Sequence, residues 1–521
     1  MNRTQRRRTR ARTLPASGLL ALCLAAAGSC MTTPALATGS NPSERPASGK
    51  WSGTLPTAPE GPYARVYYPQ NAPSAPNQVG FPHHWHAVYG NPQHNAAYAV
   101  GSNAPKWLRQ GVGWNYAEAR AWPLSDSRPF ANEVYGTREA LPVQTQFMGN
   151  ALGVTGADGV IYAESDDMFA YALNARTGQL IWRTSPLMNN LMGDPIVAGN
   201  DVYLSAGSVS FNFGHVISYA KTGKALRGED VNFNGLVALD RKTGKFKWVF
   251  LTKGEAMPTP AYAHNRLFIS TGAGNIFAVN ATDGKEIWKT HVGGTANMSD
   301  PVVYHGRVYV SMSVVPYIYC LNAKTGKVIW KRTIKGAVNT GLGDVAPAVG
   351  DGVVVDDTVA DRQVHDGHKT VNTIVGAMSA RTGKILWEHK MGRGPLPPAF
   401  KGGMPMIHNG VVYVGTPVTN VYQARDLHTG KLLWTWKIPD AGPAGAGRGP
   451  ATAYRGTLYV STGPNIYALN PKTGAQIGSH HVGGRFGIVN PAIVGGTMYL
   501  GNSWDWVNAV PLSAIKAGST G

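Results

Sequence analysis

The chain has 521 residues, of which 15% are charged and 43% are hydrophobic, and it contains 64 Gly and 14 Trp. Because about 25% charged residues is usual, this chain has too few charges to be disordered and enough apolar residues for a large core. The many glycines indicate frequent turns, which argues against an all-helical protein. Three cysteines without a Cys-x-x-Cys pair exclude a disulfide framework, a zinc ribbon and an attached c-type haem.

The first 37 residues have the features of an export signal. Arginines without any acid precede an apolar run over residues 19–28, and residues 35–37 offer small side chains for cleavage. The apolar run is too short to span a membrane. We therefore predict a signal peptide over residues 1–37 and a protein that works outside the cytoplasm, in the periplasm or associated with the outer membrane. The export route and lipidation of Cys30 stay open.

The charge of the remaining chain excludes one class of partner and favours one kind of medium. Removal of the signal lowers the net charge from +19 to +13. The basic residues are scattered singly through turns, so we expect no nucleic-acid partner. Few carboxylates mean few favourable pairings to lose when acid protonates them, which suits a strongly acidic medium.

Residues 38–80 are rich in Pro, Ser, Gly and Ala without alternating apolar positions, so we interpret them as an extended arm or linker. A repeat follows, in which a turn such as Asn174-Ala175-Arg176-Thr177-Gly178 precedes Trp182 by four residues. The seven turn glycines are Gly178, Gly244, Gly284, Gly326, Gly383, Gly430 and Gly474. Trp stands four residues later in six copies, and Gly478 replaces it in the seventh.

The spacing of these glycines, between 40 and 66 residues, is typical of β-propeller blades with two insertions. Each copy contains alternating runs for four strands, and Thr-Gly supplies the positive φ of a tight hairpin. Seven copies plus the leftover ends at 85–146 and 486–511 predict an all-β, eight-bladed propeller of four-stranded antiparallel blades over residues 81–521. Strands from both termini would close the last blade. Seven blades are the alternative.

The repeated Asn-Ala-x-Thr-Gly-x-x-x-Trp pattern, present with variations over residues 174–434, resembles the blade repeat of pyrroloquinoline quinone propellers. In overall organisation the chain is most similar to the tetrathionate hydrolases of acidophilic sulfur-oxidising bacteria. That resemblance implies hydrolysis of a small anionic sulfur compound, tetrathionate, to thiosulfate, sulfate and sulfur, without a quinone or metal cofactor. It also implies a homodimer, and peripheral association with the outer membrane stays open.

Two other functions of the same superfamily remain alternatives. A quinone-dependent alcohol dehydrogenase of this fold carries an adjacent Cys-Cys disulfide, whereas Cys320 is the one cysteine beyond the predicted signal. A non-enzymatic scaffold for outer-membrane assembly needs a firm lipoprotein signal, which Cys30 offers only loosely.

The predicted site lies on the propeller axis, where the innermost strand of each blade begins after a proline. Three residues before these prolines stand Met192, Met257, Met298, Asp344, Gly402, Gly447 and Ile488. Asp344 is the single ionisable residue of that ring, and a desolvated carboxyl there would have the raised pKa that a proton-transferring group needs. We therefore predict Asp344 as the catalytic residue, with the alternative that it ties a loop.

Four cations stand in Gly-rich or Pro-rich segments near the same end of the blades: Arg393, Lys401, Arg448 and Arg485. Because arginine donates paired hydrogen bonds to oxyanions, we predict these four residues as the substrate-binding set. Solvated loop charges are the alternative for any single one of them.

Other polar residues receive structural interpretations. We expect Asp194 and Asp300, each directly before a proline, to form turns. We expect the acidic insertion 356–361, which continues to His368, to be a solvated loop. The histidines over 83–94 are expected on the surface or in packing, and Cys320 is expected to be a buried strand residue and not a nucleophile.

Overall fold

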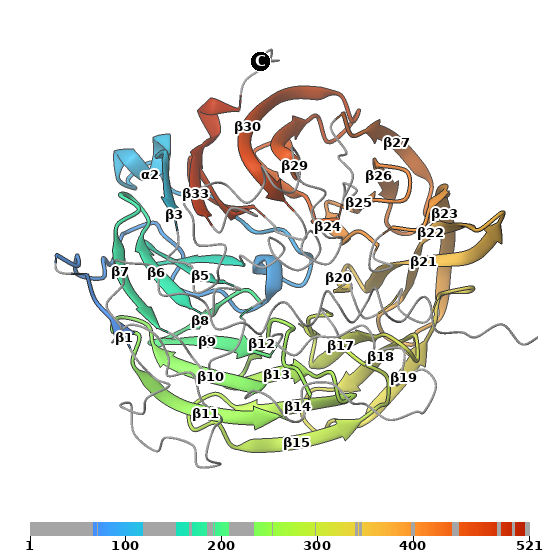
Figure 1. Ribbon diagram of the computed structural model, residues 1–521, viewed down its shortest axis with the longest axis horizontal. Helices are drawn as coiled ribbons and strands as arrows, with labels where there is room; N and C mark the ends of the chain where they lie inside the picture. The colour runs from blue at the N-terminus through green and yellow to red at the C-terminus, as the bar shows by residue number, and fades with distance from the viewer. Residues whose placement is uncertain are drawn as a thin grey trace, which may run out of the picture.

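The computed structural model describes residues 66–69, 71–117, 153–165, 169–184, 191, 193–207, 234–252, 254–296, 299–338, 342, 346–397, 402–439, 448–486, 491–502 and 506–515. The predicted signal peptide and most of the predicted arm lie outside these residues. Eight mainly antiparallel sheets stand around a common centre, which makes the protein an eight-bladed β-propeller, as the repeat predicts (Figure 1). The seven-bladed alternative is wrong.

The first four blades follow the chain from the innermost to the outermost strand. Blade 1 consists of β4 (Val154–Ala157), β5 (Val160–Glu164), β6 (Ala170–Asn174) and β7 (Leu180–Thr184), with β1 (Val66–Tyr67) added outside β7. Blade 2 consists of β8 (Ile196–Ala198), β9 (Asp201–Ala206), β10 (Asn234–Asp240) and β11 (Phe246–Thr252). Blade 3 consists of β12 (Ala261–Ala263), β13 (Arg266–Ser270), β14 (Asn275–Asn280) and β15 (Glu286–His291). Blade 4 consists of β16 (Val302–Tyr304), β17 (Arg307–Met312), β18 (Tyr317–Asn322) and β19 (Val328–Arg332).

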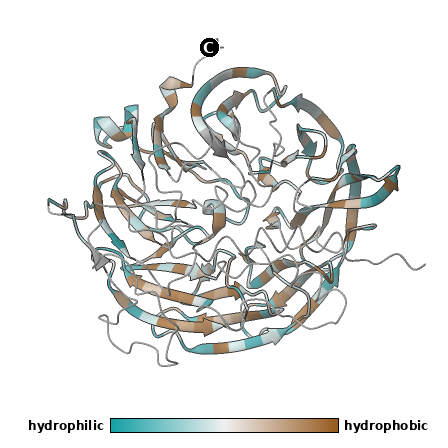
Figure 2. Cartoon of the chain, viewed as in Figure 1, coloured by the Kyte–Doolittle hydropathy of each residue, from teal (hydrophilic) through white to brown (hydrophobic). Residues whose placement is uncertain are grey.

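The next three blades repeat this order. Blade 5 consists of β20 (Ala348–Gly350), β21 (Val353–His365), β22 (His368–Ser379) and β23 (Ile385–Pro395). Blade 6 consists of β24 (Met406–His408), β25 (Val411–Thr416), β26 (Val421–Asp426) and β27 (Leu432–Lys437). In blade 7, β28 (Thr452–Tyr454) and β30 (Gln476–Phe486) flank β29 (Thr457–Leu469), which runs through the positions of both middle strands. The far end of the β21–β22 hairpin projects from the ring and is hydrophilic (Figure 2).

Both ends of the chain build blade 8, as the sequence predicts. The C-terminal part supplies β31 (Ala492–Val494), β32 (Thr497–Gly501) and β33 (Trp506–Pro511). The N-terminal part supplies the outer strand β3 (Trp114–Ala117), antiparallel to β33, and β2 (Ala97–Tyr98), parallel to β31. The helices among the described residues are short: η3 (Val88–Gly90), α2 (Lys106–Gln110) and η5 (Leu512–Ala514). Within the described ranges no helix is long and apolar enough to cross a membrane.

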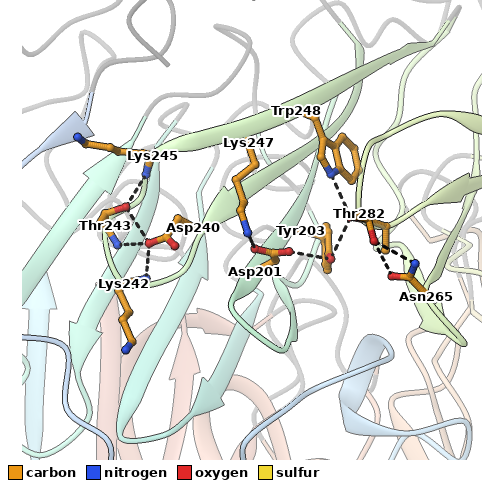
Figure 3. A network of polar contacts seen from close by, with 11 residues as sticks. Asp201, Tyr203, Asp240, Lys242, Thr243, Lys245, Lys247, Trp248, Asn265 and Thr282 are labelled. Carbon is orange, nitrogen blue, oxygen red and sulfur yellow. Dashed lines mark hydrogen bonds and ion pairs between the residues drawn. The ribbon is translucent and has the colours of Figure 1, made fainter. Parts of the chain in front are cut away.

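The repeated turn joins the third and outer strands of a blade through hydrogen bonds within the turn. In blade 2, Asp240 Oδ1 accepts the amide hydrogens of Lys242 at 3.1 Å and Thr243 at 2.9 Å, and the hydroxyl of Thr243 at 2.8 Å (Figure 3). Gly244 closes the turn with φ of 67°. Positive φ is the conformation that glycine adopts without a steric penalty.

The outer-strand tryptophan joins neighbouring blades. Trp248 Nε1 donates to the carbonyl of Ala281 in the next turn at 3.0 Å, and a Cβ on that turn's Gly284 would lie 2.6 Å from the Trp248 ring. The same donor and acceptor positions recur as Trp182–Arg241, Trp288–Ala323, Trp330–Ala380, Trp387–Leu427, Trp434–Pro471 and Trp114–Ala175. Each turn glycine therefore lies against the tryptophan of the preceding blade.

The missing tryptophan of the seventh repeat now has a physical reason. Gly478 stands opposite Ala468 in blade 7, where other blades have the tryptophan. Blade 8 takes its outer strand from the N-terminal part of the chain, so no turn connects β33 to an outer strand. Blade 7 therefore has no turn glycine to cover. Trp114 on β3 serves as the tryptophan of blade 8 and covers Gly178 of blade 1.

Candidate active site

The structure describes two of the five predicted site residues in full. Asp344 and Lys401 lie outside the described residues, so their predicted roles stay predictions. Arg485 lies in β30, and only its backbone is described. Arg393 and Arg448 occupy different parts of the ring, and no described contact brings them together.

Arg393 lies on the outer strand of blade 5 and is exposed. Its guanidinium donates to Thr370 Oγ1 and to the carbonyl of Asp361, both at 3.0 Å. These contacts hold the side chain along the projecting part of the β21–β22–β23 sheet. Its role in substrate binding stays a prediction.

Arg448 lies in the segment that leads into β28 and is only 8% exposed. Its carbonyl accepts the Met404 amide at 2.8 Å, which links the segments leading into blades 6 and 7. Its charge influences the pKa of both Asp357 and Tyr89. Arg448 is therefore an enclosed cation next to the innermost strands.

An N-terminal segment, residues 81–98, crosses the axis and contacts the innermost strands of most blades. Its backbone forms hydrogen bonds with one residue in each of five innermost strands, β8, β12, β20, β24 and β31. These residues are Val197, Tyr262, Val349, Ile407 and Ile493, respectively. Its short helix η3 lies near the centre of the ring in Figure 1. The segment therefore lies along the inner edges of these strands, bonded to the middle residue of each.

Tyr89 of this segment is buried at the centre in the left-handed conformation, with φ of 54°. Its amide donates to Asp194 Oδ2 at 3.2 Å, and its hydroxyl donates to Met404 Sδ at 2.9 Å. Asp194 precedes blade 2 and Met404 precedes blade 6, which stand four blades apart in the ring of eight. Tyr89 therefore connects opposite sides of the axis.

The two aspartates that we expected to form turns instead accept hydrogen bonds from segments far away in sequence, Asp194 from Tyr89 and Asp300 from Thr259, so the turn interpretation needs correction. The amide of Asp194 donates to Thr259 Oγ1 at 2.8 Å, and the amide of Thr259 donates to Asp300 Oδ1. These contacts tie the segments that lead into blades 2, 3 and 4 into one hydrogen-bonded chain. Burial raises the pKa of Asp194 to about 7, opposed by the hydrogen bond from Tyr89. Burial also raises the pKa of Asp300 well above its usual range.

The acidic insertion is not the solvated loop that we expected. Asp356 and Asp357 are fully buried within β21, and exposure begins only beyond Ala360. The strand β21 continues through the insertion because its valines pack in the hydrophobic core. Asp356 and Asp357 are therefore buried along with them. Buried carboxyl groups therefore also occur outside the ring of positions three residues before the prolines.

Aligning the second strands of the blades gives the signal that sequence reasoning missed. In the second strand of every blade, a tyrosine, phenylalanine or valine pairs with the innermost strand. The residue two positions after it on the second strand differs among blades. That position holds Glu164, Ser205, Ser270, Ser311, Asp357, Gly415, Ser461 and Gly501 in blades 1 to 8. Carboxyl groups at a position that is otherwise Ser or Gly mark blades 1 and 5.

Both residues face the segment that leads into the next blade. Glu164 Oε2 accepts the Gly193 amide at 3.1 Å, and Asp357 Oδ2 accepts the Gly403 amide at 2.9 Å. Burial raises the pKa of Glu164 well above its usual range, and Asp194 and Asp300 raise it further. Burial and then Asp356 raise the pKa of Asp357, against the Gly403 amide and Arg448.

In an acidic medium this arrangement is neutral except for its cation. With pKa values near or above 7, the carboxyls of Asp194 and Asp356 are protonated in acid. Arg448 contributes a positive charge to the same region. Among the described residues no group of three or more His, Cys, Asp or Glu side chains is placed to hold a metal ion.

Comparisons with known proteins agree with this architecture. The family model of the outer membrane protein assembly factor BamB matches residues 143–313, 233–355, 295–442 and 371–503. The solved structure of BamB from Moraxella catarrhalis has a TM-score of 0.50 at 15% identity, covering 69% of this chain and 95% of its own. Quinohemoprotein alcohol dehydrogenase from Comamonas testosteroni has a TM-score of 0.53 at 14% identity, covering 87% and 83%. At such low identity these structures show the fold alone.

Two curated relatives are much more similar in sequence. Tetrathionate hydrolase from Acidithiobacillus ferrooxidans is 55% identical over 466 residues, which cover 89% of this chain and 93% of that protein. Tetrathionate hydrolase from Acidianus ambivalens is 38% identical over 487 residues, which cover 86% and 88%. The chain is therefore an enzyme that belongs to the tetrathionate hydrolase family, with blades built from the repeat that the BamB family model describes.

Proposed function

We propose that this enzyme hydrolyses tetrathionate in an acidic compartment outside the cytoplasm. The observation that carries the proposal is 55% identity with a tetrathionate hydrolase over 89% of the chain. One tetrathionate and one water would give one thiosulfate, one sulfate, one sulfur atom and two protons, which balances atoms and charge. The reaction needs no external oxidant or reductant.

Water is the nucleophile in this proposal because the described part of the chain offers no reactive thiol at the axis. Cys320, which lies in β18, is fully buried, and burial raises the pKa of its thiol. A buried thiol with a raised pKa is a poor nucleophile, since the thiolate is the reactive form. Asp344 would accept the proton of water or supply one to the departing sulfur fragment.

The charge of the axis supports an anionic substrate. Tetrathionate carries a sulfonate at each end, and Arg448 offers an enclosed guanidinium next to the innermost strands. Neutral carboxyl groups around it would not repel the dianion in acid. Arg393, Lys401 and Arg485 are the further cations proposed to contact the sulfonates.

Export, homodimer formation and peripheral association with the outer membrane are parts of the same proposal. Export is supported by the arginine-rich and apolar N-terminal sequence. Size-exclusion chromatography with light scattering would test the homodimer, and fractionation of cells would test the location.

The purified protein tests the function directly. Incubation with tetrathionate at acidic pH should release thiosulfate in proportion to enzyme, and the absorbance spectrum should lack a quinone band. Alcohol oxidation together with a quinone band would support the dehydrogenase instead. A folded protein without any turnover would support the scaffold.

A further inference from the structure

Two buried carboxyl groups use only one of their two oxygens within the described structure. Glu164 Oε2 accepts the Gly193 amide, and Asp357 Oδ2 accepts the Gly403 amide. Glu164 Oε1 and Asp357 Oδ1 are buried and have no hydrogen-bond partner among the described residues. Leaving a buried polar atom unpaired costs about 1–3 kcal/mol, so a chain that keeps two such atoms calls for an explanation.

The two residues are equivalent by position and opposite in space. Both stand two residues after the aligned residue of the second strand, Tyr162 in blade 1 and Val355 in blade 5. Both bond to a glycine two residues before the proline of the next blade, Pro195 or Pro405. Blades 1 and 5 stand four apart in a ring of eight, so the two groups approach the axis from opposite sides.

The same position has a purely structural solution in another blade. In blade 3, Ser270 Oγ donates to the carbonyl of Ser299, which also lies two residues before a proline. A serine is therefore sufficient to tie one blade to the next. A carboxyl group at this position adds a second oxygen that the tie does not use.

The groups around each carboxyl decide its charge. Asp194 and Asp300 lie near Glu164, and the amides of Gly193 and Ser205 oppose their effect on its pKa. Asp356 lies near Asp357, with the Gly403 amide and Arg448 opposing, and Asp357 in turn affects the pKa of Tyr422. Burial raises the pKa of Tyr89, the charges of Asp300 and Asp194 raise it further, and the charge of Arg448 lowers it, so the central tyrosine lies within reach of charged groups from several blades. Burial with acidic neighbours favours the neutral form of both groups.

Protonation gives the unused oxygen a definite role. The oxygen that accepts a backbone amide hydrogen is occupied as an acceptor, so the proton of the neutral acid belongs on the other oxygen. A carboxylic acid then donates a hydrogen bond from Glu164 Oε1 or Asp357 Oδ1. Sulfonate oxygens are acceptors, and a dianion with a sulfonate at each end can offer one end to each side of the axis.

We propose that Glu164 and Asp357 are substrate-binding residues that act as neutral carboxylic acids, each donating a hydrogen bond from its free oxygen to a sulfonate oxygen. This inference rests on the proposed function, because it assumes that the axis receives a disulfonate such as tetrathionate. Ionisation of either group removes the donor and adds a repelling charge, so affinity falls as pH rises.

Isosteric amides separate this role from a structural one. In Glu164→Gln and Asp357→Asn the amide oxygen still accepts the glycine amide hydrogen, and the NH₂ group donates at every pH. The probe is ethane-1,2-disulfonate, which has a sulfonate at each end and no sulfur–sulfur bond to hydrolyse. Its dissociation constant is measured by calorimetry across the pH range in which the protein stays folded, alongside KM and kcat for tetrathionate.

The wild-type dissociation constant should rise by about tenfold or more for each carboxyl that ionises, since hydrogen bonds to charged groups have about this effect. Both amide variants should keep the wild-type affinity in acid and should lose much less of it as pH rises. Asp356→Asn is the matched control. Its carboxyl is equally buried, but Oδ2 already accepts the Ser311 hydroxyl and Oδ1 the Asp357 amide. This variant should therefore keep the wild-type affinity in acid and still lose it as pH rises, with the loss moved to lower pH because Asp356 no longer raises the pKa of Asp357.

Three results would overturn the inference: amide variants whose pH dependence matches the wild type, amide variants that bind poorly in acid, or a kcat that collapses while affinity is unchanged. If either variant fails to fold, infrared difference spectra of the wild type in acid replace it. The carbonyl band of protonated carboxyls should shift when the disulfonate binds, and an unchanged band counts against the proposal. Failure of the proposed function would appear differently, as disulfonate binding without tetrathionate turnover.

Discussion

The perimeter and the axis of this propeller obey different rules. At the perimeter the same contact recurs around the ring, with a turn glycine against the tryptophan of the preceding blade and the indole Nε1 bonded to the next turn. At the axis the equivalent positions differ, because blades 1 and 5 present Glu164 and Asp357 where others have Ser or Gly. Repetition therefore marks the residues that hold the ring together, and departures from repetition mark the candidates for chemistry.

The largest expected effect tests the axis. Asp344→Asn keeps nearly the same volume but abolishes titration, so turnover should fall by roughly 100-fold to 10,000-fold if Asp344 transfers a proton. The melting temperature should change little. Steady-state kinetics with tetrathionate and a thermal melt on the same preparation measure both.

Asp300→Asn is the control for this substitution because Asp300 bonds to the Thr259 amide, which an asparagine oxygen can also accept. Near-normal turnover in Asp344→Asn together with a collapse in Asp300→Asn would show that the proton-transferring residue belongs to another blade.

A second prediction concerns how the stability of the protein depends on pH through two buried carboxyl groups. Burial raises the pKa values of Asp194 and Asp356 from 3.8 to about 7. The folded state therefore binds these protons more tightly than the unfolded state. Their contribution to stability is complete below about pH 4 and is lost as pH rises to about 7, by about 4 kcal/mol for each group. Denaturant titrations at a series of pH values should show the highest stability in acid.

Asp356→Asn should flatten this dependence, because an amide stays neutral at every pH. A wild-type stability that instead rises between pH 4 and 7 would mean that these carboxyls are ionised and paired in the native protein.

The perimeter contact is tested by two glycines of blade 4 with the same backbone conformation. Gly326 and Gly306 both have φ of 72°, but a Cβ at Gly326 would lie 2.6 Å from the Trp288 ring, while nothing lies within 4 Å of one at Gly306. Gly306→Ala should lower the free energy of unfolding by about 1–2 kcal/mol, the usual cost of a left-handed alanine. Gly326→Ala should lose about 1–3 kcal/mol more through overpacking. Equal losses by chemical denaturation would show that the tryptophan contact contributes nothing.

The smallest effect is expected at Cys320, which stands where the third strands of other blades have alanine. Cys320→Ala should leave tetrathionate turnover within about twofold of the wild type and cost about 1 kcal/mol of stability. A large loss of turnover would reveal a role for this thiol and would break the separation between framework and chemistry.

The fold was predictable because its signals repeat. Thr-Gly followed by tryptophan identifies each blade, and the leftover segments at both ends predict the closure that β3 and β33 make. A local rule applied many times needs no knowledge of distant contacts. Even the one exception, Gly478, follows from that closure.

The site was less predictable because it depends on burial and on contacts between blades. In the sequence, Asp356 and Asp357 look like a solvated acidic insertion. Only the long pairing of β21 with β22 in the structure reveals that they are buried. Tyr89 reaches the axis through a segment without any repeat, so no alignment of blades could place it. Glu164 and Asp357 could have been found by comparing second strands, since their positions break the Ser or Gly pattern.

The closure of blade 8 also has a consequence for how the protein folds. Tyr116 pairs with Val507, so strands made at the beginning of synthesis wait for partners made at its end. Contacts so distant in sequence slow folding, because the chain loses the entropy of a large loop before that pairing stabilises it. Until then, the edges of blades 1 and 7 are open to strands of other molecules. Ring closure is therefore expected to be a late, slow step, and chains truncated near either end should aggregate.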